Sequence, residues 1–476
     1  MNPAPAASAA VVPGIAVARR RRTRARLRSV SRPLALAAVG WLLVELASLV
    51  GLRLLRTRFD LRYRPLSSFF TAEDRAHIEA LLRSGEGWYH RLDPLLGWSP
   101  LPSGRMAGPG RTTATQNAQG VRSLREYAPT PPEGILRVAA FGDSFVHGDE
   151  VSDGEEWASL LERSRSGLEV MNFGVSGYGP DQAWLRWQRD GVGFAPDVVV
   201  IGYMTENLLR TQNVFRPFYE RSSGFRLAKP RFRLVDDELV LLPNPLATKA
   251  RFEALLRDPE QELARLGRDD AFFAGSGWHA SRLDFLPSVR LWSLVPSALD
   301  APRRARDLSS SPDGEAFRTT RAILLAFCRD VRRTGARPLV AVFPNDADLA
   351  SLRRGVGRGW QPLVDDLRRG GCPTVDLADG FERDGTGGPI ADLFVRWHYS
   401  ARGNRIVAAA LGEAIGALGA LGAAGGAAGE EERSAPEASD REPHARAVGP
   451  SRVGRRAGTA LDSIVWKGAF GVAMRR

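Results

Sequence analysis

Residues 135–150 read ILRVAAFGDSFVHGDE, and this stretch decides the fold class that the rest of the chain has to fit. The apolar run predicts a short buried strand, and Gly142 and Asp143 predict a tight turn after it. The turn exposes the hydroxyl of Ser144 at the start of a helix, where the helix dipole favours a developing anion. A serine that only caps the helix is the alternative interpretation.

Strand and helix patterns alternate on both sides of a long interruption. The sequence predicts strands within 168–179, 196–204, 337–345 and 373–381, and helices within 153–164, 180–191, 314–335 and 400–418. The strands have little polarity on either side, as expected when helices cover both faces of a parallel sheet. The predicted fold class is therefore α/β with an open parallel sheet.

Polar candidates follow the ends of these strands. Ser144, the loop after Asn172, the loop after Met204, and His398 all fall just beyond a strand or just before a helix. Ligands of open α/β sheets bind in the crevice outside the carboxyl ends of the strands. A serine also needs a base to act as a nucleophile. His147 is too close to Ser144 along the turn to take its proton. His398 lies at the mouth of the last predicted helix, so it is the candidate base.

Three groups are candidates for stabilising an oxyanion. They are the backbone N–H of Ser144, the backbone N–H of Gly177 and the side-chain amide of Asn207. Donors of this kind are each worth on the order of 10²-fold to 10³-fold in the rate of acyl transfer. Together with Ser144 and His398 they indicate an acyl-transfer site.

Four blocks in this order resemble those of the SGNH hydrolases, also called the GDSL esterase/lipase family: GDSFVHG, NFGVSGYG, IGYMTEN and HYSARGN. The resemblance implies a three-layer flavodoxin-like sheet with the nucleophile at Ser144 and the base at His398. It implies oxyanion donors at Ser144, Gly177 and Asn207. The stretch TQNAQGVRSLREY, residues 115–127, is similar to the Asn-x-x-Gly-x-Arg lead-in of membrane-anchored bacterial members.

The sequence departs from the family pattern at two places. Leu208 follows Asn207, where the family usually has Asp. The Asp that normally orients the imidazole from two or three residues before it is absent, because Arg396 and Val395 occupy those positions. Asp392 is the candidate for the acid that orients the imidazole, if the loop doubles back. In the alternative, a backbone carbonyl holds the ring and the site is a Ser-His dyad. An orienting acid is worth up to about 10⁴ in kcat.

The N-terminal part predicts a membrane anchor. Residues 1–32 are strongly basic, and an apolar run follows that gives a predicted transmembrane segment at 33–55. A helix needs about 20 apolar residues to cross the hydrocarbon core, and flanking positive charge stays in the cytoplasm. Glu45 within the run is costly in the bilayer. A cleaved signal peptide is the alternative.

The remaining domain boundaries follow from composition and pattern. Residues 56–129 are a connecting region, and 130–420 are the hydrolase-like domain. An insertion at about 208–307 contains a predicted hairpin around Asp236, and we hypothesise that it caps the crevice. Residues 421–476 have few large apolar groups and predict a disordered tail.

Composition excludes several other classes of protein. The net charge of +12 comes from arginines crowded at the two ends, so no nucleic-acid partner is expected. Cys328 and Cys372 predict two buried thiols, with a disulfide as the alternative in an oxidising compartment. The glycine-rich loops lack the G-x-G-x-x-G order of dinucleotide sites. No cofactor or metal is expected.

Together, these patterns predict a serine esterase on the outer side of a cell membrane, with its N-terminus in the cytoplasm. It predicts hydrolysis or transfer of acyl or acetyl esters, with an ester-bearing envelope glycan or lipid as substrate. The alternative is a catalytically weak or inactive glycan-binding component of polysaccharide assembly. Protein partners are not indicated.

Overall fold

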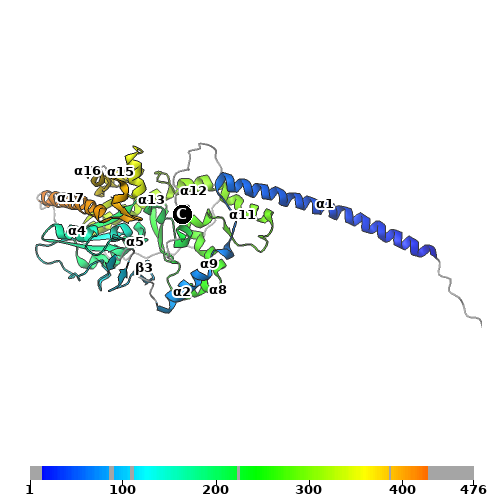
Figure 1. Ribbon diagram of the computed structural model, residues 1–476, viewed down its shortest axis with the longest axis horizontal. Coiled ribbons are helices and arrows are strands. Elements are labelled where there is room, and N and C mark those ends of the chain that lie inside the picture. Colours follow the sequence, from blue (N-terminus) through cyan, green and yellow to red (C-terminus); the bar gives the residue numbers. More distant parts are fainter. Residues whose placement is uncertain (1–12, 85–89, 108–111, 222–225, 385–387, 427–476) are drawn as a thin grey trace, which may run out of the picture. The chain divides into compact units, whose positions relative to one another are not determined.

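The computed structural model describes residues 13–84, 90–107, 112–221, 226–384 and 388–426. Figure 1 shows these residues as a ribbon coloured along the sequence. The centre of the fold is a five-stranded parallel sheet with the order β13-β12-β8-β6-β7. The strands are β6 (Leu136–Gly142), β7 (Leu168–Gly174), β8 (Val198–Met204), β12 (Arg337–Phe343) and β13 (Thr374–Asp376). In chain order this is the 2-1-3-4-5 arrangement of flavodoxin-like sheets. The predicted fold class is confirmed.

The order of the strands reverses at the pair β6 and β8. These two strands are neighbours although β7 lies between them in the sequence. The carboxyl ends of neighbouring strands at such a reversal form the crevice in which doubly wound sheets bind ligands. Every residue of β7 and β8 is buried, which explains their almost continuous apolar composition.

Helices cover both faces of the sheet. Alternate strand residues serve the two faces: Phe141 packs in one core and Ala140 in the other. The first core is completed by α5 (Pro180–Arg186), α13 (Glu315–Arg333) and α15 (Gln361–Arg369). The second is completed by α4 (Trp157–Ser164), α14 (Asp346–Arg353), α16 (Ala378–Arg383) and α17 (Ala401–Gly426). The sheet is therefore the middle of three layers.

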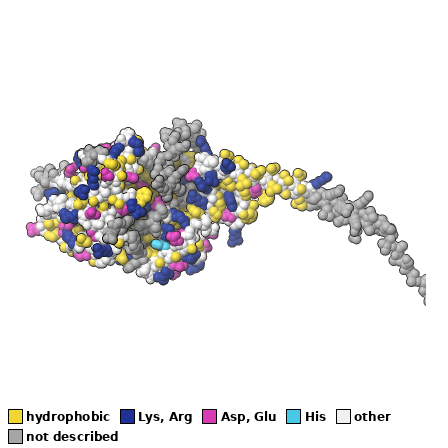
Figure 2. All heavy atoms as spheres, in the orientation of Figure 1, with side chains coloured by type: hydrophobic (Ala, Val, Ile, Leu, Met, Phe, Trp, Pro, Cys, Tyr) yellow, Lys and Arg dark blue, Asp and Glu magenta, His cyan; other side chains and the backbone are white. Residues whose placement is uncertain are grey.

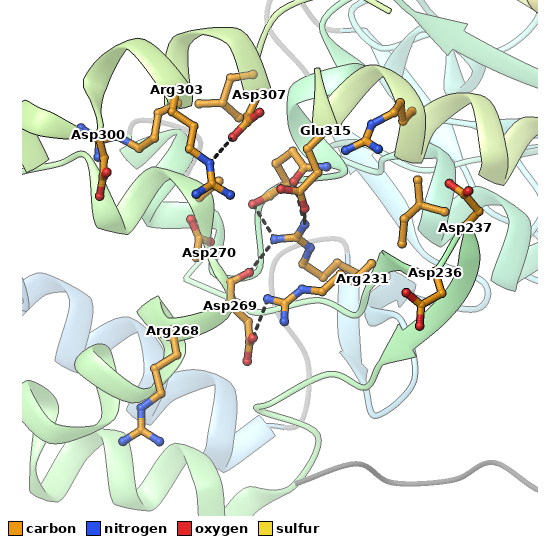
Figure 3. A pocket seen from close by; sticks show the side chains of 17 residues that line it. Arg231, Asp236, Asp237, Arg268, Asp269, Asp270, Asp300, Arg303, Asp307 and Glu315 are labelled. Atoms are coloured by element: carbon orange, nitrogen blue, oxygen red, sulfur yellow. Dashed lines mark hydrogen bonds and ion pairs between the residues drawn. The ribbon is translucent and has the colours of Figure 1, made fainter. Parts of the chain in front are cut away.

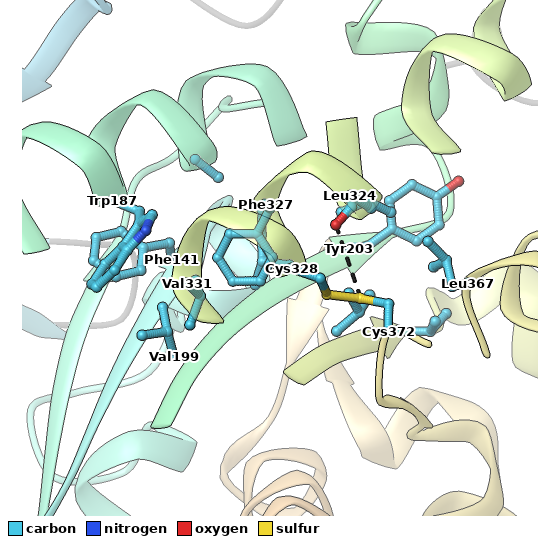
Figure 4. Packing of buried hydrophobic residues seen from close by; sticks show 14 of the residues in the cluster. Phe141, Trp187, Val199, Tyr203, Leu324, Phe327, Cys328, Val331, Leu367 and Cys372 are labelled. Carbon is cyan, nitrogen blue, oxygen red and sulfur yellow. Dashed lines mark hydrogen bonds between the residues drawn. A yellow bond between two sulfur atoms is a disulfide. The ribbon is translucent and has the colours of Figure 1, made fainter. Parts of the chain in front are cut away.

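The two cysteines form a disulfide rather than the two thiols that we predicted. Cys328 on α13 and Cys372 just before β13 have Cα atoms 5.8 Å apart and are bonded through sulfur (Figure 4). Both lie in the first core, where α13 and α15 meet over the sheet. The sequence did not reveal the pairing, because each residue by itself is typical of a buried apolar position.

The disulfide is expected to contribute measurably to stability. Its cysteines are 44 residues apart, and a loop of that length is worth about 4 kcal/mol in the chain-entropy account. A reducing agent should therefore lower the melting temperature of the protein, measured by circular dichroism. The double variant Cys328→Ala, Cys372→Ala should melt at the lower temperature with or without the reducing agent. An equal melting temperature of the unmodified protein in both buffers would contradict this expectation.

The region between β8 and α13 folds together with the region before β6. The predicted hairpin is present as β9 (Arg231–Val235) and β10 (Glu238–Leu242), with Asp236 and Asp237 at positive φ in the turn. The other elements of this region are α6 (Asn207–Arg210), α7 (Arg216–Tyr219), α8 (Lys249–Arg257), α9 (Pro259–Leu266), α10 (Ala271–Ala274), β11 (Trp278–His279), α11 (Pro287–Leu299) and α12 (Ala301–Asp307).

The segment that we predicted as a connecting region carries secondary structure of its own. It contains β1 (Arg64–Pro65), α2 (Ala72–Ser84), β2 (His90–Asp93), β3 (Gly97–Pro100), β4 (Arg105–Ala107) and β5 (Thr113–Thr115). Strand β1 pairs with β11 of the insertion. A third apolar core joins the two regions, with Leu81 and Trp98 packed among Phe252 and Leu263. The insertion therefore rests on the N-terminal region of the domain.

The N-terminal helix α1 (Pro13–Phe59) contains the apolar run. Within it, Arg32–Phe59 is long and apolar enough to span a membrane or to serve as a signal sequence, and only 11% of its most apolar stretch is buried against the rest of the protein. Hydrophobic side chains predominate on the part of this helix from residue 32 onward (Figure 2). At the other end, α17 reaches Gly426, so it runs past the predicted boundary at residue 420. The rest of the predicted tail, 427–476, lies outside the described residues, as do residues 1–12 of the basic segment.

Candidate active site

Ser144 is the first residue of the short helix α3 (Ser144–His147), directly after β6. Asp143 caps this helix: its Oδ1 accepts a hydrogen bond from the N–H of Phe145 at 2.9 Å. Gly142 has no room for a side chain, because a Cβ there would lie 2.4 Å from Val146. The residue types of the GDS stretch thus fix the turn that presents Ser144, whose relative exposure is 6%.

The other oxygen of Asp143 ties Ser144 to the end of β8. Asp143 Oδ2 accepts from Asn207 Nδ2 at 2.8 Å and from Arg210 at 3.1 Å. Asn207 Oδ1 in turn accepts the N–H of Met204 at 3.0 Å. The Asn207 amide is therefore held from both sides and keeps a second N–H for another acceptor.

Arg210 extends this connection to the loop after β7. Its guanidinium also donates to the carbonyl oxygen of Tyr178 at 2.9 Å. It therefore joins three loops at the switch point of the sheet. Sequence reasoning missed this role, because one arginine among many gives no signal of its position.

Gly177 lies in the loop after β7 with φ of +82°, a conformation that favours glycine. The hydrogen bonds of the described residues leave the N–H groups of Ser144 and Gly177 without an acceptor. The close approach of the two loops depends on Gly174, where a Cβ would lie 2.2 Å from the backbone nitrogen of His147. The predicted donors thus come from loops that the fold brings together.

His398 stands in the short hairpin of β14 (Phe394–Val395) and β15 (His398–Tyr399), just before α17. Its ring packs against that of Phe145, the residue after Ser144, with centroids 5.2 Å apart. The structure therefore brings the Ser144 helix and the His398 hairpin into contact. Among the described hydrogen bonds, none joins the Ser144 hydroxyl to the imidazole; such bonds are often formed only with substrate bound.

The carboxylate beside His398 belongs to Glu150. His398 Nδ1 lies 3.3 Å from Glu150 Oε2, although the ring N–H is not aligned well enough to count as a hydrogen bond. The same oxygen accepts the backbone N–H groups of Trp397 at 3.1 Å and His398 at 3.3 Å. Glu150 has φ of +71°, a strained conformation for a residue with a side chain. Strain of this kind is often kept at functional sites.

The charges around His398 stabilise its protonated form. Burial acts to lower the pKa of His398, but the contact with Glu150 and the negative charge of Asp149 outweigh it, so the pKa is raised above 6.5. For Glu150, burial acts to raise the pKa, and the contact with His398 and the N–H donors of the hairpin outweigh it, so the pKa is lowered. The pair therefore favours a carboxylate next to an imidazole that binds a proton readily.

Asp392, our candidate for the third catalytic residue, lies elsewhere. Its side chain is exposed, and its backbone carbonyl accepts the hydroxyl of Ser400 at 2.8 Å. The hairpin that carries His398 points its N–H groups and its imidazole toward Glu150, so the ring meets a carboxylate from the segment that follows α3. The physical reason is that the backbone N–H groups of Trp397 and His398 bind the carboxylate of Glu150 beside the ring.

Both ring nitrogens of His147 have partners other than Ser144. Its Nδ1 lies 2.5 Å from Asp149 Oδ1, and its Nε2 lies 3.0 Å from the amide nitrogen of Gln116. Asp149 also accepts the hydroxyl of Ser176 at 2.7 Å. Burial lowers the pKa of His147 despite its carboxylate neighbour, so the neutral ring is favoured. The sequence prediction that His147 is not the base fits this placement.

The Asn-x-x-Gly-x-Arg stretch holds the loop that carries Glu150. Asn117 Oδ1 accepts the N–H groups of Gln119 and Val121, and Gly120 turns the chain at positive φ. The buried guanidinium of Arg122 then donates to the carbonyl oxygens of His147, Gly148 and Val151; the bonds to His147 and Val151 are each 2.7 Å. These three carbonyls bracket residues 149 and 150.

A cavity of about 690 Å³ lies apart from these residues, in the insertion (Figure 3). Two of the arginines that line it form ion pairs: Arg231 with Glu315 at 3.2 Å and Arg233 with Asp269 at 3.0 Å. The residues that line it include no histidine and no cysteine. This cavity therefore offers neither the base nor the nucleophile that the Ser144 site offers.

In the described part of the chain, no three His, Cys, Asp or Glu side chains are placed to hold a metal ion.

Comparison with solved structures finds an alpha/beta hydrolase, a protein of the G-D-S-L family and acetylxylan esterases. LAE5, an alpha/beta hydrolase from the metagenome of Lake Arreo in Spain, shares 15% identity at a TM-score of 0.32 over 60% of this chain and 96% of its own. A putative lipolytic protein of the G-D-S-L family from Desulfitobacterium hafniense shares 13% identity at 0.30 over 59% and 99%.

The acetylxylan esterase Axe2 from Geobacillus stearothermophilus is a third similar structure. It shares 13% identity at a TM-score of 0.32, over 59% of this chain and 94% of its own. No family model matches the sequence, and no curated protein matches it. These likenesses are weak, so the functional proposal depends on the geometry of the site.

Proposed function

We propose that this protein is a serine esterase with a Ser144-His398-Glu150 catalytic triad. The observation that carries the proposal is the carboxylate of Glu150 at 3.3 Å from His398 Nδ1, on the sheet edge that also holds Ser144. In such a triad the imidazole takes the proton of the serine, and the carboxylate orients the imidazole, so the serine becomes an activated nucleophile. The N–H groups of Ser144, Gly177 and Asn207 supply the donors for an oxyanion.

The proposed reaction forms and then breaks an acyl-enzyme. Ser144 Oγ attacks the ester carbonyl while His398 Nε2 takes its proton, and the three N–H donors stabilise the tetrahedral oxyanion. His398 returns the proton to the leaving alcohol, and water or a second alcohol then releases the acyl group. Glu150 keeps the imidazole in the tautomer that has Nε2 free to accept, and it stabilises the imidazolium.

The proposed location is the outer side of a cell membrane, with the apolar part of α1 as anchor and the basic N-terminal residues in the cytoplasm. Positive charge before an apolar helix favours this orientation. The Cys328–Cys372 disulfide supports it independently, because disulfides persist in oxidising compartments. The proposed substrates are acyl or acetyl esters on envelope glycans or lipids, with acyl transfer to a glycan as a variant of the same chemistry.

Labelling with a fluorophosphonate tests the proposal. The reagent forms a covalent bond to an activated serine, so the purified protein should be labelled and the Ser144→Ala variant should not. Ser152, which is in the same part of the chain but outside the site, gives the control variant Ser152→Ala, which should be labelled like the unmodified protein. Equal labelling of the Ser144→Ala variant would remove Ser144 from the mechanism.

A second readout separates the esterase from a binding protein with the same crevice. The esterase should hydrolyse a short-chain aryl ester faster than buffer does. Absence of both labelling and turnover, with glycan binding that persists in Ser144→Ala, would favour the glycan-binding alternative.

A further inference from the structure

The acidic residue inside the apolar part of α1 has a specific partner. Glu45 is buried, and its carboxylate accepts the backbone N–H of Ser288 at 2.9 Å and the hydroxyl of Ser288 at 2.6 Å. Ser288 lies in the first turn of α11, after Pro287 at the first helical position. The first N–H groups of a helix have no partner within the helix, and its positive end favours a carboxylate. Glu45 therefore caps α11.

Small residues let the two helices pack closely. Ser48 and Gly51 follow Glu45 at helical spacing, and they share the face of α1 that is at least partly covered. A Cβ at Gly51 would lie 2.9 Å from Leu291 of α11, so glycine allows the leucine to reach the α1 backbone. Close packing through small residues, with a polar contact between the helices, is typical of helix pairs inside a membrane.

The outward side of α11 carries large apolar side chains, and the loop before it adds Leu283 and Phe285 beside the charged residues Arg282 and Asp284. The relative exposures are 52% for Leu283, 66% for Phe285, 79% for Trp292 and 75% for Leu299. They lie next to the apolar part of α1, whose leucines are also exposed. Arg290 turns away from this side: its guanidinium donates to the carbonyl of Asp284 and lies 5.8 Å from the ring of Tyr63.

We propose that α11, together with the side chains of Leu283 and Phe285, is embedded in the outer leaflet of the membrane beside α1, as a second membrane contact that does not span it. At 13 residues α11 is about 20 Å long, which is too short to cross the hydrocarbon core. Lipid is the occupant that fits, because the exposed apolar side chains continue the surface of a helix that itself requires lipid. The inference rests on the membrane anchor of the proposed function.

The same arrangement explains why Glu45 is tolerated in the bilayer. A carboxylate in hydrocarbon needs a partner in the bundle, and the capped end of α11 supplies two donors at that depth. The insertion that carries α11 starts directly after Asn207, a residue of the candidate site. Embedding α11 therefore holds the insertion at the membrane surface, which suits an ester substrate carried by a lipid.

Depth-dependent quenching tests the inference with the full chain in liposomes. The native cysteines are paired, so a single introduced cysteine can be labelled with an environment-sensitive fluorophore without reduction. The test variants are Trp292→Cys and Phe285→Cys, which probe the contact separately. Leu46→Cys on α1 is the reference inside the membrane, and Leu124→Cys, also strongly exposed, is the reference in water. Lipids with a nitroxide on the acyl chain are the quencher.

We expect the labels at positions 292 and 285 to lose most of their emission, as the label at position 46 does, while the label at position 124 keeps its emission. If the label at position 46 is quenched but the labels at 292 and 285 keep their emission, the inference is overturned and the anchor stays intact. An unquenched label at 46 would overturn both. If one of the test variants does not fold, the other decides.

Discussion

Replacement of His398 by alanine is expected to lower kcat for a short-chain aryl ester by about 10⁶-fold, because the serine then has no base to take its proton. The ring of His398 packs on Phe145 beside Ser144, and it is the histidine that the fold brings to the crevice from the end of the chain. Stopped-flow or steady-state release of the aryl alcohol measures the loss directly.

The control for this prediction is His77→Ala, because His77 is an exposed residue of α2 away from the sheet edge. That variant should keep the activity of the unmodified protein. The double variant Ser144→Ala, His398→Ala should be no slower than either single variant, since residues that act as a unit have strongly non-additive effects. Losses that multiply in the double variant would show that the two residues do not act as a unit.

The strands of the sheet could be predicted from the sequence, because local patterns determine them, whereas their order was implied only by the family resemblance. The runs that became β6, β7 and β8 are apolar throughout, and each is followed by a turn with glycine or a polar residue. The positions of Ser144, Gly177 and Asn207 beyond strand ends follow from these patterns and from the topology.

The partner of His398 could not be predicted, because it depends on a contact between residues 248 positions apart. Proximity in sequence favoured Asp392, six residues before the histidine. In the structure, Glu150 has a positive φ, and its carboxylate accepts the N–H groups of Trp397 and His398. Neither feature leaves a pattern in the sequence of residues 390–398.

The supports of the site were missed for a similar reason. Arg122 and Arg210 are buried and act through carbonyl oxygens and a carboxylate from other segments. Arginine is frequent in this chain, so the sequence does not distinguish these two arginines from the others. Residues 115–127 resemble a lead-in motif of the family that includes Arg122, but the motif did not predict which groups this arginine binds.

Replacement of Glu150 by glutamine is expected to lower kcat by up to about 10⁴-fold, the loss that follows when the carboxylate that orients a catalytic imidazole becomes an amide. The substitution keeps the size of the side chain and an oxygen for the N–H groups of Trp397 and His398. The matched control is Asp392→Asn, at the exposed position that the sequence favoured, and this variant should retain full activity.

The pH profile of kcat/KM distinguishes a positioning residue from a merely structural one. His398 must be neutral to act as a base, so activity falls as the pH drops below the pKa of His398. Burial acts to lower that pKa, while Glu150 and Asp149 raise it above 6.5. Loss of the Glu150 charge should therefore move the acid limb of the profile of Glu150→Gln to lower pH. The acid limb of Asp392→Asn should stay where it is in the unmodified protein. A large loss in Asp392→Asn together with full activity in Glu150→Gln would reassign the orienting acid, because the side chain at 3.3 Å from Nδ1 would then do nothing for the imidazole.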